Sequence, residues 1–319
     1  MKTLKYGLLL LCSLIILGTV EAQQRAITST YMYNGLVINP AYAGSLNVLS
    51  LTGVHRDQWV NVDGAPQFQV FTGHTSLLSN RIGVGLTVSK DQIGVHDDVG
   101  VFGSYAYKIR TNIGILAMGL QAGFNSRTSD FSNLSLLDNN DPFLFGQQSN
   151  FTPNFGTGLY FANPDFFLGV SVPYILENRV YDELDLGSSN LPPVDKSFLN
   201  SRESRYYYVT SGGVIHLSSK IKLNPSFLLR IQEEQKVGWD INVNVIFDEI
   251  AYVGTNVRRG GDLTFLGQLI LNENFRIGYA YDAITNNLND YSAGSHEIMV
   301  NYRIKLRNYK KDPGCPVYF

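Results

Sequence analysis

From residue 47 to residue 305 the chain alternates apolar residues with small or polar ones at a period of two. The stretch 81–90, for example, reads Arg-Ile-Gly-Val-Gly-Leu-Thr-Val-Ser-Lys. Such alternation is typical of β-strands whose two faces meet different surroundings. It predicts strands over Asn47–Asp57, Gln67–Leu78, Arg81–Lys90, Asp98–Arg110, Ile113–Ser126, Pro153–Ala162, Phe166–Tyr174, Arg205–Ser218, Ile221–Gln232, Val237–Phe247, Ile250–Arg258, Asp262–Asn272, Phe275–Asp282 and His296–Ile304.

The connections between these strands alternate between short and mostly longer ones. Short connections are predicted at 79–80, 111–112, 163–165, 219–220, 248–249 and 273–274, and longer ones at 58–66, 91–97, 128–152, 175–204 and 283–295. An even number of strands with short turns on one rim and long loops on the other is typical of outer-membrane barrels, whose short turns face the periplasm. The sequence therefore predicts an all-β fold, a transmembrane antiparallel β-barrel of about 14 strands in the outer membrane, with both chain ends on the periplasmic side.

Composition favours this membrane barrel over a soluble β-sandwich, which would also alternate. Charged residues make up only 16% of the 319 residues, while the chain carries 19 Tyr and 18 Phe. The polar face of each strand is rich in Gly, Asn and Ser, where a soluble sheet would show more Lys and Glu. The formal charge of −2 and the lack of a basic stripe argue against nucleic acid as a partner.

The first 22 residues are predicted to be a cleavable signal peptide. Lys2 and Lys5 precede an apolar core, and Val20-Glu21-Ala22 offers a cleavage site. An uncleaved anchor is disfavoured because the apolar run is shorter than the roughly 20 residues that a spanning helix needs. A lipoprotein is disfavoured because Cys12 lies inside the apolar core. The mature chain then keeps Cys315 alone, so an internal disulfide is excluded.

The segment 31–45, which reads Tyr-Met-Tyr-Asn-Gly-Leu-Val-Ile-Asn-Pro-Ala-Tyr-Ala-Gly-Ser, fits neither a helix nor a strand. Pro40 removes a backbone donor, and the many large side chains are unlike those of a solvated linker. The segment could be a lead-in that caps the first strand, or a plug or partner contact. The expected domain plan is a signal peptide (1–22), a plug segment (23–46), the barrel (47–305) and a periplasmic tail (306–319).

We expect Asn39-Pro40-Ala41-Tyr42 to pack against the inside or the periplasmic rim of the barrel. The first and last strands must pair to close the sheet, so the segment that leads into the first strand should lie beside the last one. That last strand carries His296 and Glu297.

Candidate chemistry along the chain is sparse. The five histidines form no metal-binding spacing, and no nucleophile elbow or phosphate loop is present, so no enzyme activity, cofactor or metal is expected. His96 and His296 lie next to acidic residues and could form a rim hydrolase, but a rim hydrogen bond is the favoured interpretation. Charges predicted to face the lumen are expected to pair with one another. They are Arg230, Asp240, Arg276, Asp282, Glu297 and Arg303.

Several blocks of the sequence resemble the PorP/SprF family of outer-membrane barrels associated with type IX secretion. They are Asn34–Ser45, His55–Trp59 with Gly64–Pro66, Gly278–Asp282, Gly294–Ile298 and the Cys315-Pro316 ending. The residues assigned to this structural or partner motif are Asn39, Pro40, Ala41, Tyr42, Gly44, Arg56, Gln58, Trp59, Pro66, Asp282, His296 and Glu297.

The resemblance implies a non-enzymatic role in the secretion or surface attachment of adhesins that carry a C-terminal sorting domain, and in some members gliding motility. The implied partners are outer-membrane lipid, such an adhesin and periplasmic components of the secretion machinery. The alternative function is an outer-membrane transport barrel for a small or apolar solute. A lumen filled by side chains or by the segment 31–45 would argue against transport.

Overall fold

The computed structural model describes residues 27–132, 147–178, 205–232, 236–260, 262–285 and 291–306. The predicted signal peptide and nearly all of the predicted tail, including Cys315, lie outside these residues. The strands are β1 (Leu49–Asp57), β2 (Gln67–Leu77), β3 (Ile82–Ile93), β4 (His96–Thr111), β5 (Gly114–Asp130), β6 (Gln147–Ala162), β7 (Phe166–Val172), β8 (Tyr206–Gly213), β9 (Ile215–His216), β10 (Ile221–Gln232), β11 (Gly238–Phe247), β12 (Ala251–Arg258), β13 (Leu263–Ile270), β14 (Phe275–Ala283) and β15 (Ser295–Ile304).

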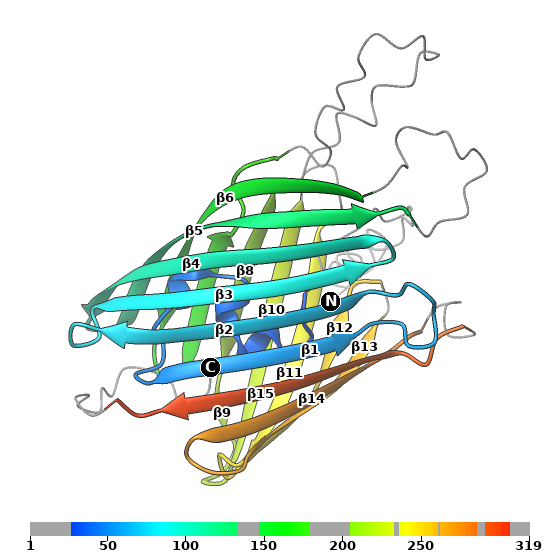
Figure 1. Ribbon diagram of the computed structural model, residues 1–319. Coiled ribbons are helices and arrows are strands. Elements are labelled where there is room, and N and C mark those ends of the chain that lie inside the picture. Colours follow the sequence, from blue (N-terminus) through cyan, green and yellow to red (C-terminus); the bar gives the residue numbers. More distant parts are fainter. Residues whose placement is uncertain are drawn as a thin grey trace, which may run out of the picture.

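These strands form one closed antiparallel sheet (Figure 1). Each strand pairs with its neighbours in sequence, and β1 pairs with β15 from Leu49 opposite Ile304 to Asp57 opposite His296. β8 and β9 both pair with β10 and are separated only by Val214, so they are two parts of one strand. The barrel therefore has 14 strands, which confirms the predicted fold class.

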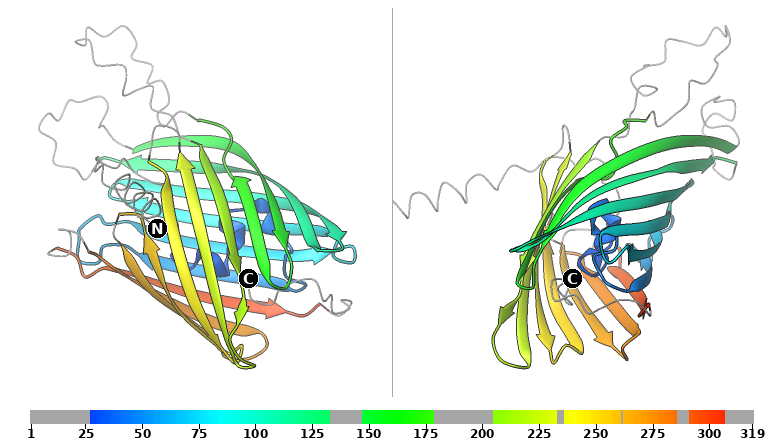
Figure 2. Two further views of the ribbon diagram at one scale, coloured as in Figure 1. Left: turned by 180° about the vertical axis from the view of Figure 1, so that it is seen from behind. Right: turned by 90° about the vertical axis from the view of Figure 1, so that its left-hand side faces the viewer.

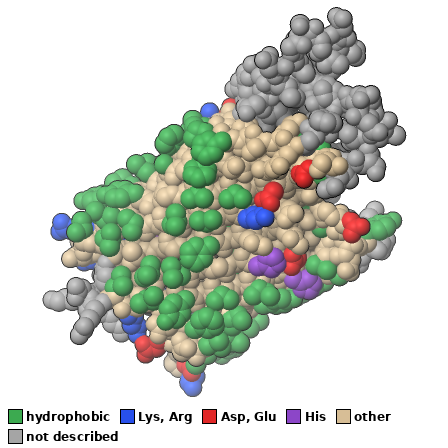
Figure 3. Space-filling view, in the orientation of Figure 1, with side chains coloured by type: hydrophobic (Ala, Val, Ile, Leu, Met, Phe, Trp, Pro, Cys, Tyr) green, Lys and Arg blue, Asp and Glu red, His purple; other side chains and the backbone are tan. Residues whose placement is uncertain are grey.

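The two faces of the wall differ as the sequence pattern predicts. In β11, Asp240, Asn242 and Asn244 are buried inside the barrel, whereas Ile241 and Val243 are exposed on its outer surface. Figure 3 shows many hydrophobic side chains and only a few charged side chains and histidines on the visible outer face. An apolar outer band and a polar lumen are the arrangement that a lipid bilayer stabilises.

The strands of the barrel differ in length, and the predicted long loop between β3 and β4 is absent. β4, β5 and β6 have 16, 17 and 16 residues, more than the roughly 9–11 that cross a bilayer. β3 and β4 continue to a tight turn at Gly94 and Val95, so the prediction of a longer connection over 91–97 is wrong. Gly94 has a φ of 55°, which suits a tight hairpin turn.

The segment that precedes β1 lies within the barrel (Figure 2). It contains three short 3-10 helices, η1 (Tyr31–Tyr33), η2 (Gly35–Val37) and η3 (Pro40–Tyr42). We refer to residues 27–46 as the plug. Its members are largely buried, with Leu36 and Ala41 each only 1% exposed. Among the described residues, no helix has the length and apolar character needed to cross a membrane.

Candidate functional site: the plugged lumen

A buried carboxylate on the last strand holds the N-terminal end of the plug. The Oε2 atom of Glu297 accepts a hydrogen bond of 2.7 Å from the Ser29 backbone N–H, and Oε1 accepts one of 2.9 Å from the Thr30 N–H. The Thr30 hydroxyl also donates to Oε1. Glu297 is fully buried, so these backbone donors replace the water that an exposed carboxylate would bind.

Arg56 on β1 joins this carboxylate to a second one. Its Nη1 atom lies 3.3 Å from Glu297 Oε2, and its Nη2 atom lies 2.5 Å from Asp282 Oδ2. The Ser29 hydroxyl accepts a 2.9 Å hydrogen bond from Arg56 and donates to Asp282. We refer to Arg56, Asp282 and Glu297, with Ser29 and Thr30, as the latch. It fixes the plug to β1, β14 and β15, on both sides of the seam that closes the barrel.

A second ion cluster lies elsewhere in the lumen wall. Asp240 pairs with Arg230 at 2.9 Å and with Arg258 at 3.1 Å. Burial raises the pKa of the Tyr31 phenol far above its ordinary value, and the nearby Asp240 carboxylate raises it further. The phenol therefore stays neutral, and Tyr31 belongs to a buried hydrophobic cluster that includes Tyr208 and Leu228.

The other end of the plug lies against strand positions where glycine leaves no side chain in the way. A Cβ atom on Gly83 would lie 1.9 Å from Ala43 O, one on Gly119 would lie 2.1 Å from Ala41 N, and one on Gly158 would lie 2.2 Å from Asn39 Oδ1. We refer to these three glycines, on β3, β5 and β6, as the glycine seat. Any larger residue there would occupy space that the plug fills.

The sequence around Pro40 shapes the plug for this seat. Asn39 caps η3 by accepting a 2.9 Å hydrogen bond from Ala41 N, and its amide donates to Leu159 O at 3.0 Å. Pro40 occupies the first helical position, where its missing N–H has no partner to lose. The Tyr42 ring packs edge-on against Tyr160 and His74, each at 5.5 Å between ring centroids.

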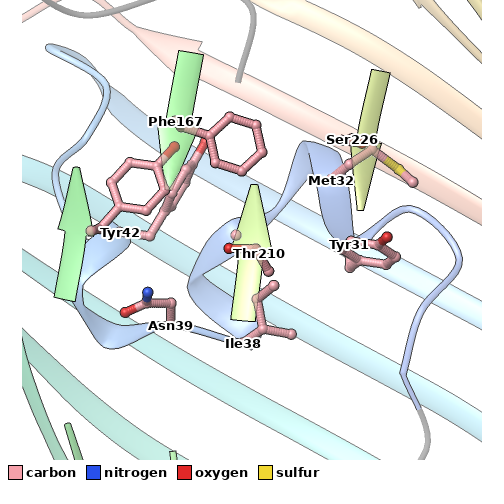
Figure 4. Close-up of a pocket in the computed structure, with 10 residues that line it drawn as sticks. Tyr31, Met32, Ile38, Asn39, Tyr42, Phe167, Thr210 and Ser226 are labelled. Atoms are coloured by element: carbon pink, nitrogen blue, oxygen red, sulfur yellow. The ribbon is translucent and has the colours of Figure 1, made fainter. Parts of the chain in front are cut away.

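The plug and the wall enclose a small cavity beside Tyr31 and Tyr42. A cavity of about 30 Å³ lies among plug residues and the side chains of Phe167, Thr210 and Ser226 (Figure 4). This volume holds about two water molecules. The plug also contacts other sides of the lumen: Tyr33 donates to Asn244 at 3.1 Å, and Thr72 donates to Asn34 at 2.9 Å.

The position of Asn39–Tyr42 corrects the prediction that these residues lie near His296 and Glu297. They contact β4, β5 and β6, while Ser29 and Thr30 contact the closing strand. The plug crosses the lumen before it reaches β1, so adjacency to the last strand does not extend to residues ten positions upstream. Its described N-terminal end lies at the level of Arg56, in the half nearer the long loops and not at the periplasmic rim.

A family model for the type IX secretion system membrane protein PorP/SprF matches residues 20–302. The chain belongs to the PorP/SprF family. The family model describes a membrane protein of the type IX secretion system. A search of curated proteins finds no match to this sequence.

Solved outer-membrane proteins share the barrel architecture with this PorP/SprF chain. The CymD monoaromatic hydrocarbon channel is 9% identical, with a TM-score of 0.51, over 87% of this chain and 94% of that one. The Acinetobacter baumannii outer membrane protein Omp33 is 8% identical, with a TM-score of 0.44, over 82% of this chain and 99% of that one. At such low identity these likenesses concern the fold alone.

The motif residues of the PorP/SprF chain fall into two groups. Asn39, Pro40, Ala41 and Tyr42 are buried in the plug, and Gly44 N donates to His74 at 3.1 Å. Arg56, Asp282 and Glu297 meet in the latch.

The remaining motif residues lie outside the lumen contacts, near the long-loop rim. Gln58 and Pro66 close the β1–β2 loop through a 2.9 Å backbone hydrogen bond. Trp59 N donates to Ser295 Oγ at 3.2 Å, and His296 bonds to Tyr279 at 2.6 Å on the outer face. The two sequence blocks around Arg56 and Glu297 are thus brought together across the barrel seam.

Sequence reasoning missed Ser29, Thr30 and the glycine seat. Ser29 and Thr30 precede the segment that stood out for its large side chains, and small polar residues near a chain end give little signal. The seat glycines occur at alternate strand positions that any polar, lumen-facing residue could fill. The close approach of the plug marks them out, and no sequence pattern records it; at Gly103, on the outer face, an added Cβ would meet nothing closer than 3.9 Å.

Substituting a seat glycine is expected to displace the plug. Gly119→Ala should lower the free energy of unfolding by about 1–3 kcal/mol, because its Cβ would overlap the backbone of Ala41. Gly103→Ala on the outer face is the matched control and should change it little. Unfolding in urea and protease digestion of the plug measure the two effects; equal behaviour of the two variants would contradict the role of the seat.

Removing the arginine of the latch is expected to destabilise the barrel strongly. Arg56→Gln leaves two buried carboxylates without their cation and should cost about 3–5 kcal/mol. The neighbouring Asp57→Asn breaks only an exposed pair with His55 and should cost about 0–1 kcal/mol. Chemical unfolding of both variants in lipid vesicles provides the comparison, and a loss below 1 kcal/mol for Arg56→Gln would argue against the latch.

Proposed function

We propose that this barrel supports the secretion or surface attachment of an adhesin that carries a C-terminal sorting domain. In this role it acts as a binding and anchoring component and not as a conduit. The proposal rests on membership in a type IX secretion family together with one observation, the plug that fills the lumen. A barrel whose interior is occupied offers its rims and loops to partners.

The energetics of the plug support a stably closed lumen. Leu36, Ala41, Tyr42 and Ala43 bury apolar surface against Tyr160 and the alanines of β4, β5 and β6. Each large side chain contributes roughly 1.5–3 kcal/mol to docking. The latch adds charge-assisted hydrogen bonds at the other end. Opening the lumen would break both sets of contacts, so the ground state is closed.

The transport alternative has less support. The CymD monoaromatic hydrocarbon channel has a similar fold, but the solute in its name is a property of that protein. In this chain the cavity beside the plug is only about 30 Å³, too small for an aromatic solute. A solute path would therefore require the plug to move.

The secretion role is tested by deleting the gene and following an adhesin with a C-terminal sorting domain. Surface labelling of intact cells should show loss of the adhesin, with the protein retained inside the cell or released to the medium. Complementation with the wild-type chain and with Gly103→Ala should restore it. An unchanged set of surface proteins in the deletion strain would refute the proposal.

The plugged state predicts a barrel with low conductance. Purified wild-type protein in planar bilayers should conduct poorly, and deletion of residues 29–43 should open large, lasting channels because the lumen loses its filling. Gly103→Ala again serves as the control for a correctly folded, plugged barrel. Large conductance of the wild-type protein would favour the transport alternative.

A further inference from the structure

Two arginines face the lumen near the short-turn rim, and neither forms an ion pair with a carboxylate that the structure describes. Arg276 is the second residue of β14, and Arg303 is the next-to-last residue of β15. Arg276 pairs with Asn301 across the ladder, and Arg303 lies two residues beyond Asn301, on the same face of β15. Such diagonal neighbours lie about 7–8 Å apart, so their long side chains can reach one small anion together.

Arg276 differs from the other deeply buried arginines of the lumen. Arg56 and Arg230 each form an ion pair with a buried carboxylate. Arg276 is 9% exposed, and its side chain forms no ion pair or hydrogen bond with any residue that the structure describes. Its Nη1 atom is buried and has no hydrogen-bond partner there. A buried guanidinium without a counter-ion is unfavourable, so an anion at this position would be stabilising.

The neighbouring groups are arranged to present donors. Arg303 Nε donates to Asn301 Oδ1 at 2.9 Å, while the Asn301 amide is fixed by Ser50 Oγ at 2.9 Å and Thr52 Oγ1 at 2.8 Å. This chain of hydrogen bonds orients the Arg303 guanidinium before a ligand arrives, which lowers the entropy lost on binding. Gln268, 6% exposed and on β13 beside β14, adds an amide on the same face.

The surrounding charge at this rim is positive. Lys108 is buried there and donates to Gly44 O and Asn80. Glu249 is already paired with Lys222 at 2.5 Å. Lys305 follows β15 and is paired with Glu273, and Arg81, Arg110 and Lys220 at the short turns outnumber Asp165 and Asp248 there. The short-turn rim is the periplasmic one in outer-membrane barrels.

We propose that Arg276 and Arg303 bind a carboxylate of an acidic peptide segment that a periplasmic partner inserts into this mouth of the barrel. A guanidinium presents paired N–H donors that match the two oxygens of a carboxylate, and the positive rim would attract an acidic chain. The bound segment would lie below the plug, because the Tyr33 ring packs edge-on against Tyr252 at 6.1 Å between ring centroids and Tyr252 pairs with Gln268 on β13, next to β14.

The test measures binding of a fluorescent hexaglutamate peptide with an amidated C-terminus to the purified full-length barrel in detergent, by fluorescence anisotropy. Arg276→Gln and Arg303→Gln should each weaken binding about tenfold or more, since each removes charged hydrogen bonds. Arg276→Lys keeps the charge but loses the paired donors, so it should fall between Arg276→Gln and the wild type. Arg110→Gln is the matched control, because it removes one charge from an exposed position at the same rim.

Three results would overturn the proposal. Binding unaffected by Arg276→Gln would exclude the site, and equal weakening by Arg110→Gln would reduce it to general rim charge. Inorganic phosphate that binds in an Arg276-dependent manner while hexaglutamate does not would assign the site to phosphate. Heat-dependent gel migration verifies that each variant is folded. Because binding is measured on the purified barrel, its outcome is independent of the adhesin phenotype that tests the secretion role.

Discussion

One buried arginine between two buried carboxylates determines how the plug is held. Arg56 alone cannot neutralise both Asp282 and Glu297, and Glu297 completes its hydrogen bonding with the backbone N–H groups of Ser29 and Thr30. The plug is thus part of the electrostatic balance of the lumen and not an independent insert. A barrel without it would bury a carboxylate with unsatisfied oxygens, which the low dielectric of the interior makes unfavourable.

The two ends of the plug are fixed by different kinds of interaction. The latch depends on charge and hydrogen bonds, whereas the glycine seat depends on shape, because Gly83 and Gly119 let the plug backbone approach the wall and Gly158 leaves room for the Asn39 side chain. The latch lies in the half of the lumen nearer the long loops, and the seat lies nearer the short turns. Anchors on different strands and at different depths leave the plug one orientation, which explains why a segment with only three 3-10 turns is so well buried.

The strands and their closure could be predicted because a lipid-facing wall enforces strict alternation. The β3–β4 turn could not, because Lys90-Asp91-Gln92 is polar on both faces and reads as a loop once the strand leaves the bilayer. Arg56 and Glu297 were identified from motif blocks, but their pairing follows from the register of β1 with β15. The place of Asn39–Tyr42 depends on how the chain crosses the lumen, and no local pattern specifies that path.

The latch also constrains the order of assembly. Ser29 precedes the first strand, and its bond to Glu297 spans 268 residues to the last strand. Contacts of such separation form late, after the intervening chain has been ordered. Until β15 arrives, β1 keeps an unpaired hydrogen-bonding edge, and the N-terminal end of the plug has no carboxylate to hold it. That end of the plug can therefore dock only after the last strand has paired, so its docking marks the completion of the barrel.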